Sequence, residues 1–348
     1  MRRFSSHCCP LYSLSREWDP SLIRHAQTIY PVFFAQKRLN GLIVFRRQRL
    51  ELPDGDFLDI DWVDAEQAMA PTMVLFHGLE GSSASGYAQA LASVCRHRGW
   101  RCAVVHFRGC SGQINRGPRA YYAGDIGDVE AALTSIRQTV CSGADAAVNR
   151  GPITAVGVSL GGNALSLWAS QRGSKANQWI DSLVSVSAPF DLAASGLAID
   201  RGPNRSIYAR LFLSTMKRKA WLKAQQYPGL FDLPRVLAAN TLRVFDDAFT
   251  APLHGFSGVD DYWARASAKS HLSKLSIPSL LINARNDPLV PADSLPIASD
   301  LPAEVQVCQP EAGGHVGFMA SSTLGLPGEV TSFAQSLCRW AAETWPRS

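Results

Sequence analysis

The chain has 348 residues, of which 46% are hydrophobic and 18% charged, and this composition is typical of a globular protein with a substantial core. The net charge of +5 is mild, and no Lys/Arg run is dense enough to predict nucleic-acid binding. Eight scattered cysteines without a Cys-x-x-Cys pair predict neither a zinc site nor a disulfide framework. No apolar run has the length of a signal-peptide core or of a membrane-spanning helix. We therefore expect a cytoplasmic protein with free thiols and no integral membrane segment.

An antiparallel hairpin is predicted near the N-terminus. Residues 1–40 contain three prolines and are expected to form an irregular segment that wraps over the domain. Strand-like stretches follow at residues 42–45 and 48–52, and Pro53-Asp54-Gly55 is typical of a tight turn. Residues 57–62 then alternate apolar and acidic side chains, so the hairpin is expected to have one solvent-exposed face.

A parallel sheet is predicted for the rest of the core, because continuous apolar strands alternate with helices. The predicted strands are residues 73–76, 102–105, 153–158, 182–187, 279–283 and 304–307. The predicted helices are residues 87–98, 125–140 with Asp125 as the N-cap, 163–171 and 328–345.

Residues 190–265 interrupt this alternation of strands and helices. They contain no clear strand, and aromatic side chains such as Trp221 and Phe249 lie among basic helices. An insertion of this length between sheet elements predicts a helical lid. The chain is thereby divided into an N-terminal wrapping segment (1–40), a core (41–189 and 266–348) and a lid (190–265).

The stretch from Gly157 to Gly161 has the Gly-x-Ser-x-Gly pattern at a junction of predicted strand and helix. This order is required for a nucleophile elbow, in which Ser159 adopts a strained conformation at the end of a strand. Glycines are needed at Gly157 and Gly161, because a Cβ would collide with the neighbouring chain. The amide groups at the start of the next helix then point toward the place where an oxyanion would form. The alternative is a turn of small residues with a surface serine.

A serine hydroxyl is a poor nucleophile at neutral pH and requires a base that is oriented by an acid. His315 is the predicted base, because flanking glycines in the loop before the last helix would let its ring approach Ser159. Two aspartates compete for the role of the acid. Asp287 follows the strand at 279–283 directly, and Asp191 follows the strand before the lid. Both keep the order Ser, Asp, His, and the prediction favours Asp287, with Asp191 as a helix cap at the lid entrance.

Several stretches together resemble the α/β-hydrolase family and, more narrowly, the YheT-like hydrolases, which are related to ABHD-type esterases and lipases. The matching stretches are His25-Ala26-Gln27-Thr28-Ile29-Tyr30-Pro31, residues 52–57, 77–83, 107–112, 157–162 and 262–291. The resemblance spans about residues 20–340 and implies an α/β-hydrolase fold that cleaves carboxylic esters, often with short- or medium-chain acyl groups. It also implies a triad of Ser159, Asp287 and His315. Arg24 departs from the family pattern, which usually has glycine at this position.

In an α/β-hydrolase fold, the loop His77-Gly78-Leu79-Glu80-Gly81 would supply the second oxyanion donor. The backbone N–H groups of Leu79 and Leu160 are therefore the predicted pair, and His77 is expected to brace the loop rather than to transfer protons. This mechanism needs no metal or organic cofactor, and the expected partner is a small, lipid-like ester.

Other functions of the same residues stay open. An acyltransferase would use the same triad and pass the acyl group to an alcohol instead of water. A non-catalytic binding protein on a hydrolase fold is disfavoured, because no member of the triad is missing. A peptidase is also open, although the family resemblance argues against it.

Overall fold

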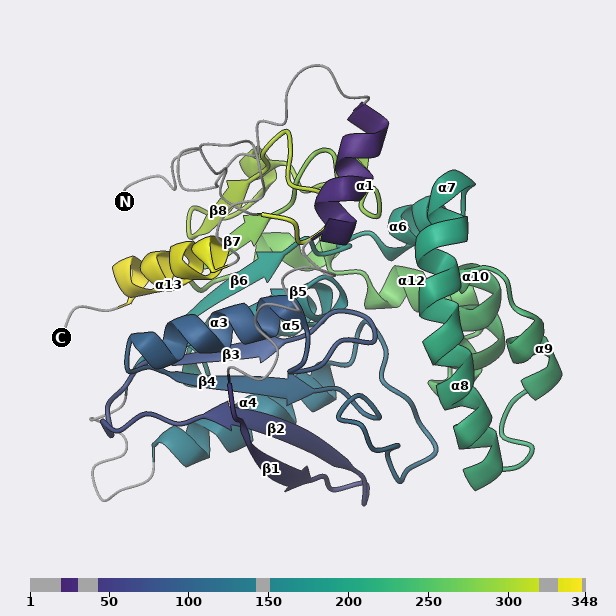
Figure 1. Ribbon diagram of the computed structural model, residues 1–348, viewed down its shortest axis with the longest axis horizontal. Helices are drawn as coiled ribbons and strands as arrows, with labels where there is room; N and C mark the ends of the chain where they lie inside the picture. Colours follow the sequence, from purple (N-terminus) through teal and green to yellow (C-terminus); the bar gives the residue numbers. More distant parts are fainter. Residues whose placement is uncertain (1–19, 31–42, 142–150, 319–330, 346–348) are drawn as a thin grey trace.

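The computed structural model describes residues 20–30, 43–141, 151–318 and 331–345. These residues form an eight-stranded sheet with the strand order β1-β2-β4-β3-β5-β6-β7-β8 (Figure 1). The strands are β1 Arg46–Glu51, β2 Phe57–Val63, β3 Thr72–Phe76, β4 Arg101–His106, β5 Ile153–Val158, β6 Ser182–Val186, β7 Ser279–Ile282 and β8 Val305–Cys308. β2 is antiparallel to both β1 and β4, and the other neighbours are parallel. The predicted mostly parallel sheet with an N-terminal antiparallel hairpin is confirmed.

Helices cover both faces of the sheet, which explains why every residue of the central strands β3, β5, β6 and β7 is buried. The helices of the core are α1 Pro20–Tyr30, α3 Gly86–His97, α4 Ile126–Val140, α5 Leu160–Arg172 and α13 Ser332–Thr344. Alternate residues of β3 enter different cores. Val74 and Phe76 pack in the cluster that contains α4 and α5, and Met73 and Leu75 pack in the cluster that contains α3 and α13.

The N-terminal segment contains a helix where an irregular chain was predicted. Helix α1 begins at Pro20, which was expected to interrupt structure. Proline is tolerated in the first turn of a helix, because the N–H that it lacks would have no intrahelical acceptor there. Pro31 follows the last helical residue. The other residues of this predicted segment, 1–19 and 31–40, lie outside the described residues.

On the hairpin face that was predicted to be exposed to solvent, the residues of β2 are buried, and only those of β1 are exposed. All seven residues of β2 are buried, including Asp59 and Asp61. The register places Arg49 opposite Asp59 and Arg47 opposite Asp61, and the arginines form ion pairs of 2.9 and 2.7 Å with these carboxylates. The acidic alternation therefore meets arginines of the edge strand rather than water, as a buried charge requires. The strand predicted at 42–45 is also wrong over its described part, since β1 begins at Arg46.

Asp125 occupies the N-cap position of α4, but its side chain makes no capping hydrogen bond. Instead, the Asp125 carboxylate is buried and accepts a hydrogen bond of 2.6 Å from Arg119. The predicted N-cap position is therefore correct, but the side chain does not cap the helix, because Arg119, six residues away, binds the carboxylate.

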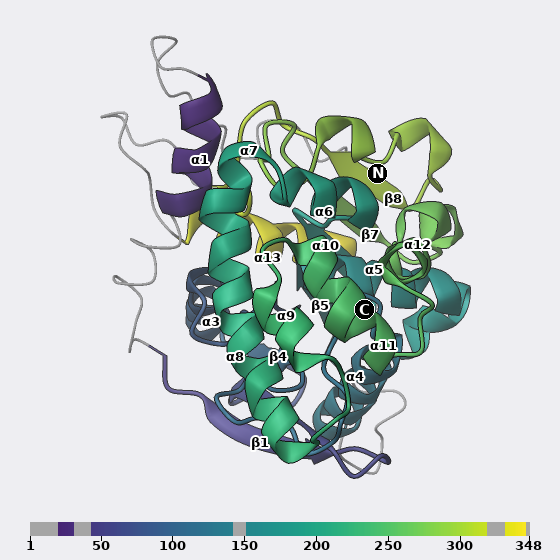
Figure 2. The same ribbon diagram turned by 90° about the vertical axis from the view of Figure 1, so that its right-hand side faces the viewer.

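Residues 190–265, which we call the helical insertion, contain helices and no strand. Its helices are α6 Leu192–Ile199, α7 Gly202–Asn204, α8 Arg210–Gln226, α9 Leu233–Ala238, α10 Leu242–Phe245 and α11 Ala251–Leu253, and α12 Val259–Ala266 closes it. It has an apolar cluster of its own that includes Leu213, Val236 and Phe249. Figures 1 and 2 show these helices gathered on one side of the molecule, beyond the ends of the central strands. In the described parts of the chain, no helix has the length and apolar character needed to cross a bilayer.

Candidate active site

Ser159 lies in the sharp turn between β5 and α5, with φ of 52° and ψ of −121°. A positive φ is uncommon for a residue with a side chain and is typical of a strained functional position. A Cβ on Gly157 would lie 2.5 Å from the carbonyl oxygen of Gly161, and one on Gly161 would lie 2.4 Å from that of Phe76. The prediction that both glycines are needed for close approach is therefore confirmed. Helix α5 begins at Leu160, three residues before its predicted start.

The structure brings Ser159, His315 and Asp287 into one hydrogen-bonded chain. His315 Nδ1 lies 2.8 Å from Asp287 Oδ2, and His315 Nε2 lies 3.0 Å from Ser159 Oγ. With Nδ1–H donating to the carboxylate, the lone pair of Nε2 faces the serine hydroxyl. Asp287 is buried, and its other oxygen accepts a hydrogen bond of 2.8 Å from the Leu289 amide. Nucleophile, base and orienting acid thus have the spacing that proton transfer requires.

Asp191, the competing candidate for the acid, has a different role in the structure. One carboxylate oxygen accepts a hydrogen bond of 3.0 Å from the Ala194 amide and caps α6 at the entrance of the helical insertion. The other oxygen lies 3.4 Å from Lys269 Nζ. Asp191 therefore acts as a helix cap, as the sequence-based alternative predicted.

The candidate oxyanion donors lie on two elements beside Ser159. Leu79 is in the loop after β3, where the Gly81 amide donates to the carbonyl of Gly78 at 2.9 Å and closes a tight turn. This turn lies close to the serine, since a Cβ on Gly78 would be 3.1 Å from Ser159 Cβ. Leu160 is the first residue of α5, so its amide has no acceptor within the helix.

His77 braces the loop that carries Leu79. Its ring is fully buried, Nδ1 donates to the carbonyl of Gly78 at 2.7 Å, and Nε2 accepts from the Phe107 amide at 3.2 Å. Burial lowers the pKa of His77 to about 3, so the ring is neutral at physiological pH. A neutral ring with both nitrogens bonded to backbone groups supports structure rather than proton transfer.

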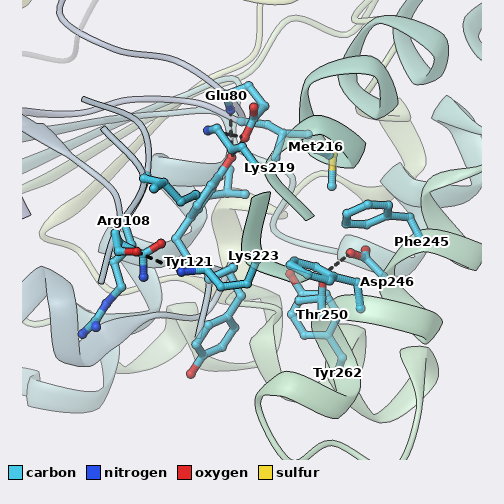
Figure 3. Close-up of a pocket in the computed structure, with 18 residues that line it drawn as sticks. Glu80, Arg108, Tyr121, Met216, Lys219, Lys223, Phe245, Asp246, Thr250 and Tyr262 are labelled. Carbon is cyan, nitrogen blue, oxygen red and sulfur yellow. Dashed lines mark hydrogen bonds and ion pairs between the residues drawn. The ribbon is translucent and has the colours of Figure 1, made fainter. Parts of the chain in front are cut away.

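A cavity of about 60 Å³ lies between the candidate oxyanion donors and the helical insertion (Figure 3). The wall on the core side includes Leu79 and Leu160. The wall on the insertion side includes Met216, Phe245 and Phe249. This volume is well below the roughly 300–1,000 Å³ of common ligand pockets, so it holds a few waters or a small group rather than a long chain.

An ion pair joins the insertion to the oxyanion loop. Lys219 Nζ, on α8, lies 2.8 Å from Glu80, which also accepts a hydrogen bond of 2.7 Å from the hydroxyl of Tyr121 (Figure 3). One turn further along α8, the buried Lys223 donates to two backbone carbonyls of the loop at residues 115–117. Burial lowers the pKa of Lys223 to about 8. Sequence reasoning missed these contacts, because the lysines are more than a hundred residues away from their partners.

Arg108 connects two of the stretches on which the family resemblance rests. Its guanidinium is buried and donates to Asp54 and Asp56 in the β1–β2 turn, at 2.8 and 2.9 Å, and to Asp128 on α4, at 2.7 Å. These carboxylates raise the pKa of Arg108 despite its burial. Arg108 also lines the cavity, so this ion-pair network fixes one side of the site.

Helix α1 supports the loops of both the candidate base and the candidate acid. Thr28 Oγ1 accepts a hydrogen bond of 3.0 Å from the His315 amide. Gln27 Oε1 accepts one of 2.9 Å from the side chain of Asn286 and one of 3.2 Å from the Gly313 amide. Both Gln27 and Thr28 are buried. The sequence showed them only as part of a family motif, and their positioning role depends on partners more than 250 residues away.

Comparison with known proteins agrees with the fold and with the geometry of this site. A family model described as the alpha/beta hydrolase fold matches residues 71–321. The chain is 37% identical over 306 residues to "Putative esterase YheT" of Escherichia coli (strain K12), with 86% of this chain and 85% of that protein covered. It is 27% identical to Phospholipase ABHD3 of Mus musculus, with 91% and 76% covered. A solved esterase of Pyrobaculum calidifontis, at 17% identity and a TM-score of 0.54 over 95% of this chain and 94% of that one, shares the fold. The chain therefore belongs to the α/β-hydrolase fold family and is a hydrolase of the group that contains YheT and the ABHD proteins.

Proposed function

We propose that this protein hydrolyses carboxylic esters through an acyl-serine intermediate on Ser159. The observation that carries the proposal is the hydrogen-bonded chain from Asp287 through His315 to Ser159 Oγ, with its distances of 2.8 and 3.0 Å. The strained elbow backbone of Ser159 supports it, because such strain is maintained where it serves function. The esterase and lipase relatives favour an ester over a peptide as the substrate.

In the proposed reaction, His315 Nε2 takes the proton of Ser159 as Oγ attacks the ester carbonyl. The N–H groups of Leu79 and Leu160 would stabilise the oxyanion, and protonated His315 would give its proton to the departing alcohol. Water activated by the same imidazole then releases the acid from the acyl-serine. Asp287 holds the ring orientation and stabilises the imidazolium throughout. Each step uses side-chain and backbone groups of this chain.

We further propose that the helical insertion acts as a lid and receives the acyl chain. Its apolar side chains Met216, Phe245 and Phe249 line the cavity next to Leu79 and Leu160. Because the cavity is small, it would accommodate a short chain as it stands and a medium chain only after α8 shifts outward. The lipid-directed relatives, a phospholipase and a monoacylglycerol lipase, support an apolar acyl group.

The acyl-chain dependence of activity tests this proposal. Burial of each methylene is worth about 0.8 kcal/mol, so kcat/KM should rise up to about fourfold per added carbon if that energy reaches the transition state. The rise should stop at medium chain length, when the pocket is filled. The measurement is kcat/KM for p-nitrophenyl esters from acetyl to dodecanoyl. A flat or steadily falling series would show that the insertion does not bind the acyl chain.

The support that α1 gives to the base loop leads to a second prediction. Thr28→Val keeps the side-chain shape but removes the acceptor of the His315 amide, so the ring should lose its alignment. We expect kcat to fall by roughly ten- to a hundredfold with little change in KM, in line with the cost of a small misplacement of catalytic groups. Thr28→Ser keeps the hydroxyl and should retain most of the activity. Equal activity of the two variants would contradict the positioning role of Thr28.

A further inference from the structure

Helix α8 has two faces with different surroundings. Its inner face contributes Met216, Lys219 and Lys223 to the cavity wall. The opposite face is exposed, and Figure 2 shows α8 on the outer side of the helical insertion. We call this the α8 outer face. It consists of Ile207, in the π-helical segment Arg205–Ala209 that leads into α8, and of Arg210, Leu211, Ser214, Arg218 and Trp221.

The α8 outer face exposes large apolar side chains. Ile207, Leu211 and Trp221 are 40%, 58% and 47% exposed. Their spacing of four and ten residues, with Ser214 and Arg218 between, places them along one side of the helix. Ten large apolar side chains in the described residues are exposed, and seven of these belong to the helical insertion. The exposed apolar surface is therefore concentrated on this part of the molecule.

The same face carries two arginines, Arg210 and Arg218, and no acidic side chain. Residues 201–231 contain seven Lys or Arg residues and no Asp or Glu. Lys219 and Lys223 turn inward to the core, as described above. Arg210 and Arg218 point outward, and neither forms an ion pair with any described residue. Their positive charges are therefore left facing the solvent.

We propose that the α8 outer face docks on the surface of an anionic lipid bilayer. A helix face that combines arginines with a tryptophan and aliphatic residues matches the two parts of such a surface, since the arginines meet lipid phosphates and the apolar groups enter the acyl boundary. Arginine side chains extend to the charged headgroups while their neighbours are immersed. The exposed charge argues against a second copy of this chain, because a two-fold pair would set these arginines against one another. Docking goes beyond the proposed esterase activity and does not depend on it, although it would place the cavity behind α8 close to lipid.

Co-sedimentation with vesicles tests the proposal, with Ser159→Ala protein used throughout so that lipid is not hydrolysed. We expect binding to mixed phosphatidylcholine–phosphatidylglycerol vesicles, little binding to phosphatidylcholine alone, and loss of binding as salt screens the charges. Each basic residue near an anionic surface strengthens binding by about fivefold, so Arg210→Gln with Arg218→Gln should weaken it by about 25-fold. Leu211→Ser with Trp221→Ser should weaken it by at least about tenfold.

Matched controls change exposed residues elsewhere on the molecule. Lys175→Gln with Lys274→Gln removes two exposed charges outside the helical insertion. Ile297→Ser removes an apolar side chain that is 64% exposed. These variants should bind vesicles like the parent. Equal losses in control and α8 variants, or equal binding to neutral and anionic vesicles, would overturn the proposal. So would sedimentation of the parent as a dimer that the Leu211→Ser, Trp221→Ser variant dissociates, because the face would then be covered by a second copy.

Activity separates this proposal from the proposed function. With Ser159 intact, the α8 outer-face variants should hydrolyse soluble p-nitrophenyl butyrate at the parental rate, since none of the changed residues lines the cavity. Vesicle binding by Ser159→Ala protein would support docking whatever the outcome of the esterase assays. A loss of soluble-ester activity in these variants would show that the face acts on the site rather than on a membrane, and would also overturn the proposal.

Discussion

Ser159→Ala is expected to lower the rate of ester hydrolysis by about 10⁶-fold while the protein stays folded. The Ser159 hydroxyl lies 3.0 Å from His315 Nε2 and is the group that this base can deprotonate. Its removal therefore leaves only background catalysis by the oxyanion groups and by binding. The strained backbone at residue 159 already accommodates a Cβ, so alanine should add no steric conflict. The measurements are the turnover of p-nitrophenyl butyrate and the midpoint of thermal unfolding.

The control for this variant is Ser299→Ala, which removes an exposed hydroxyl that donates a hydrogen bond to Asp300 and does not line the cavity. It should leave both turnover and unfolding unchanged. Near-normal turnover by folded Ser159→Ala protein would refute the assignment of Ser159 as the nucleophile and with it the proposed mechanism.

Asp287→Asn is expected to lower kcat by about 10⁴-fold. An amide at this position cannot stabilise the imidazolium, and it favours the tautomer in which Nε2 carries the proton, as in the serine-protease precedent. In the parent protein, the buried carboxylate accepts one hydrogen bond from His315 Nδ1 and one from the Leu289 amide, both of 2.8 Å. Asparagine has nearly the same shape, so the loop should persist and the loss should appear in kcat rather than in folding.

Asp191→Asn is the matched control, because it makes the same chemical change in the competing acid. Asparagine is as good an N-cap as aspartate, so the α6 cap should survive and activity should change little. A large loss at Asp191 together with a mild effect at Asp287 would mean that the acid belongs to the strand before the helical insertion.

The sequence by itself determined the features that depend on local backbone chemistry. The elbow is readable because strand, glycine-flanked turn and helix are contiguous, and His315 is readable as the base because it lies in the glycine-containing loop after the last strand. Continuous apolar stretches indicated a sheet covered on both faces, and the structure distributes Val74 and Met73 to opposite cores accordingly. In each case the deciding interactions lie within a few residues, or follow from the alternation of side chains along a strand.

Only the tertiary structure decided which polar groups meet across the chain. Asp191 and Asp287 both follow strands, and they differ because one carboxylate reaches a helix start and the other reaches His315. The acidic residues of β2 looked solvent-exposed, yet the arginines of β1 cover them. Gln27 and Lys219 gained their roles from partners 286 and 139 residues away. Such pairings leave no periodicity in the sequence, because a side chain that is buried on folding takes its partner from whichever element packs against it.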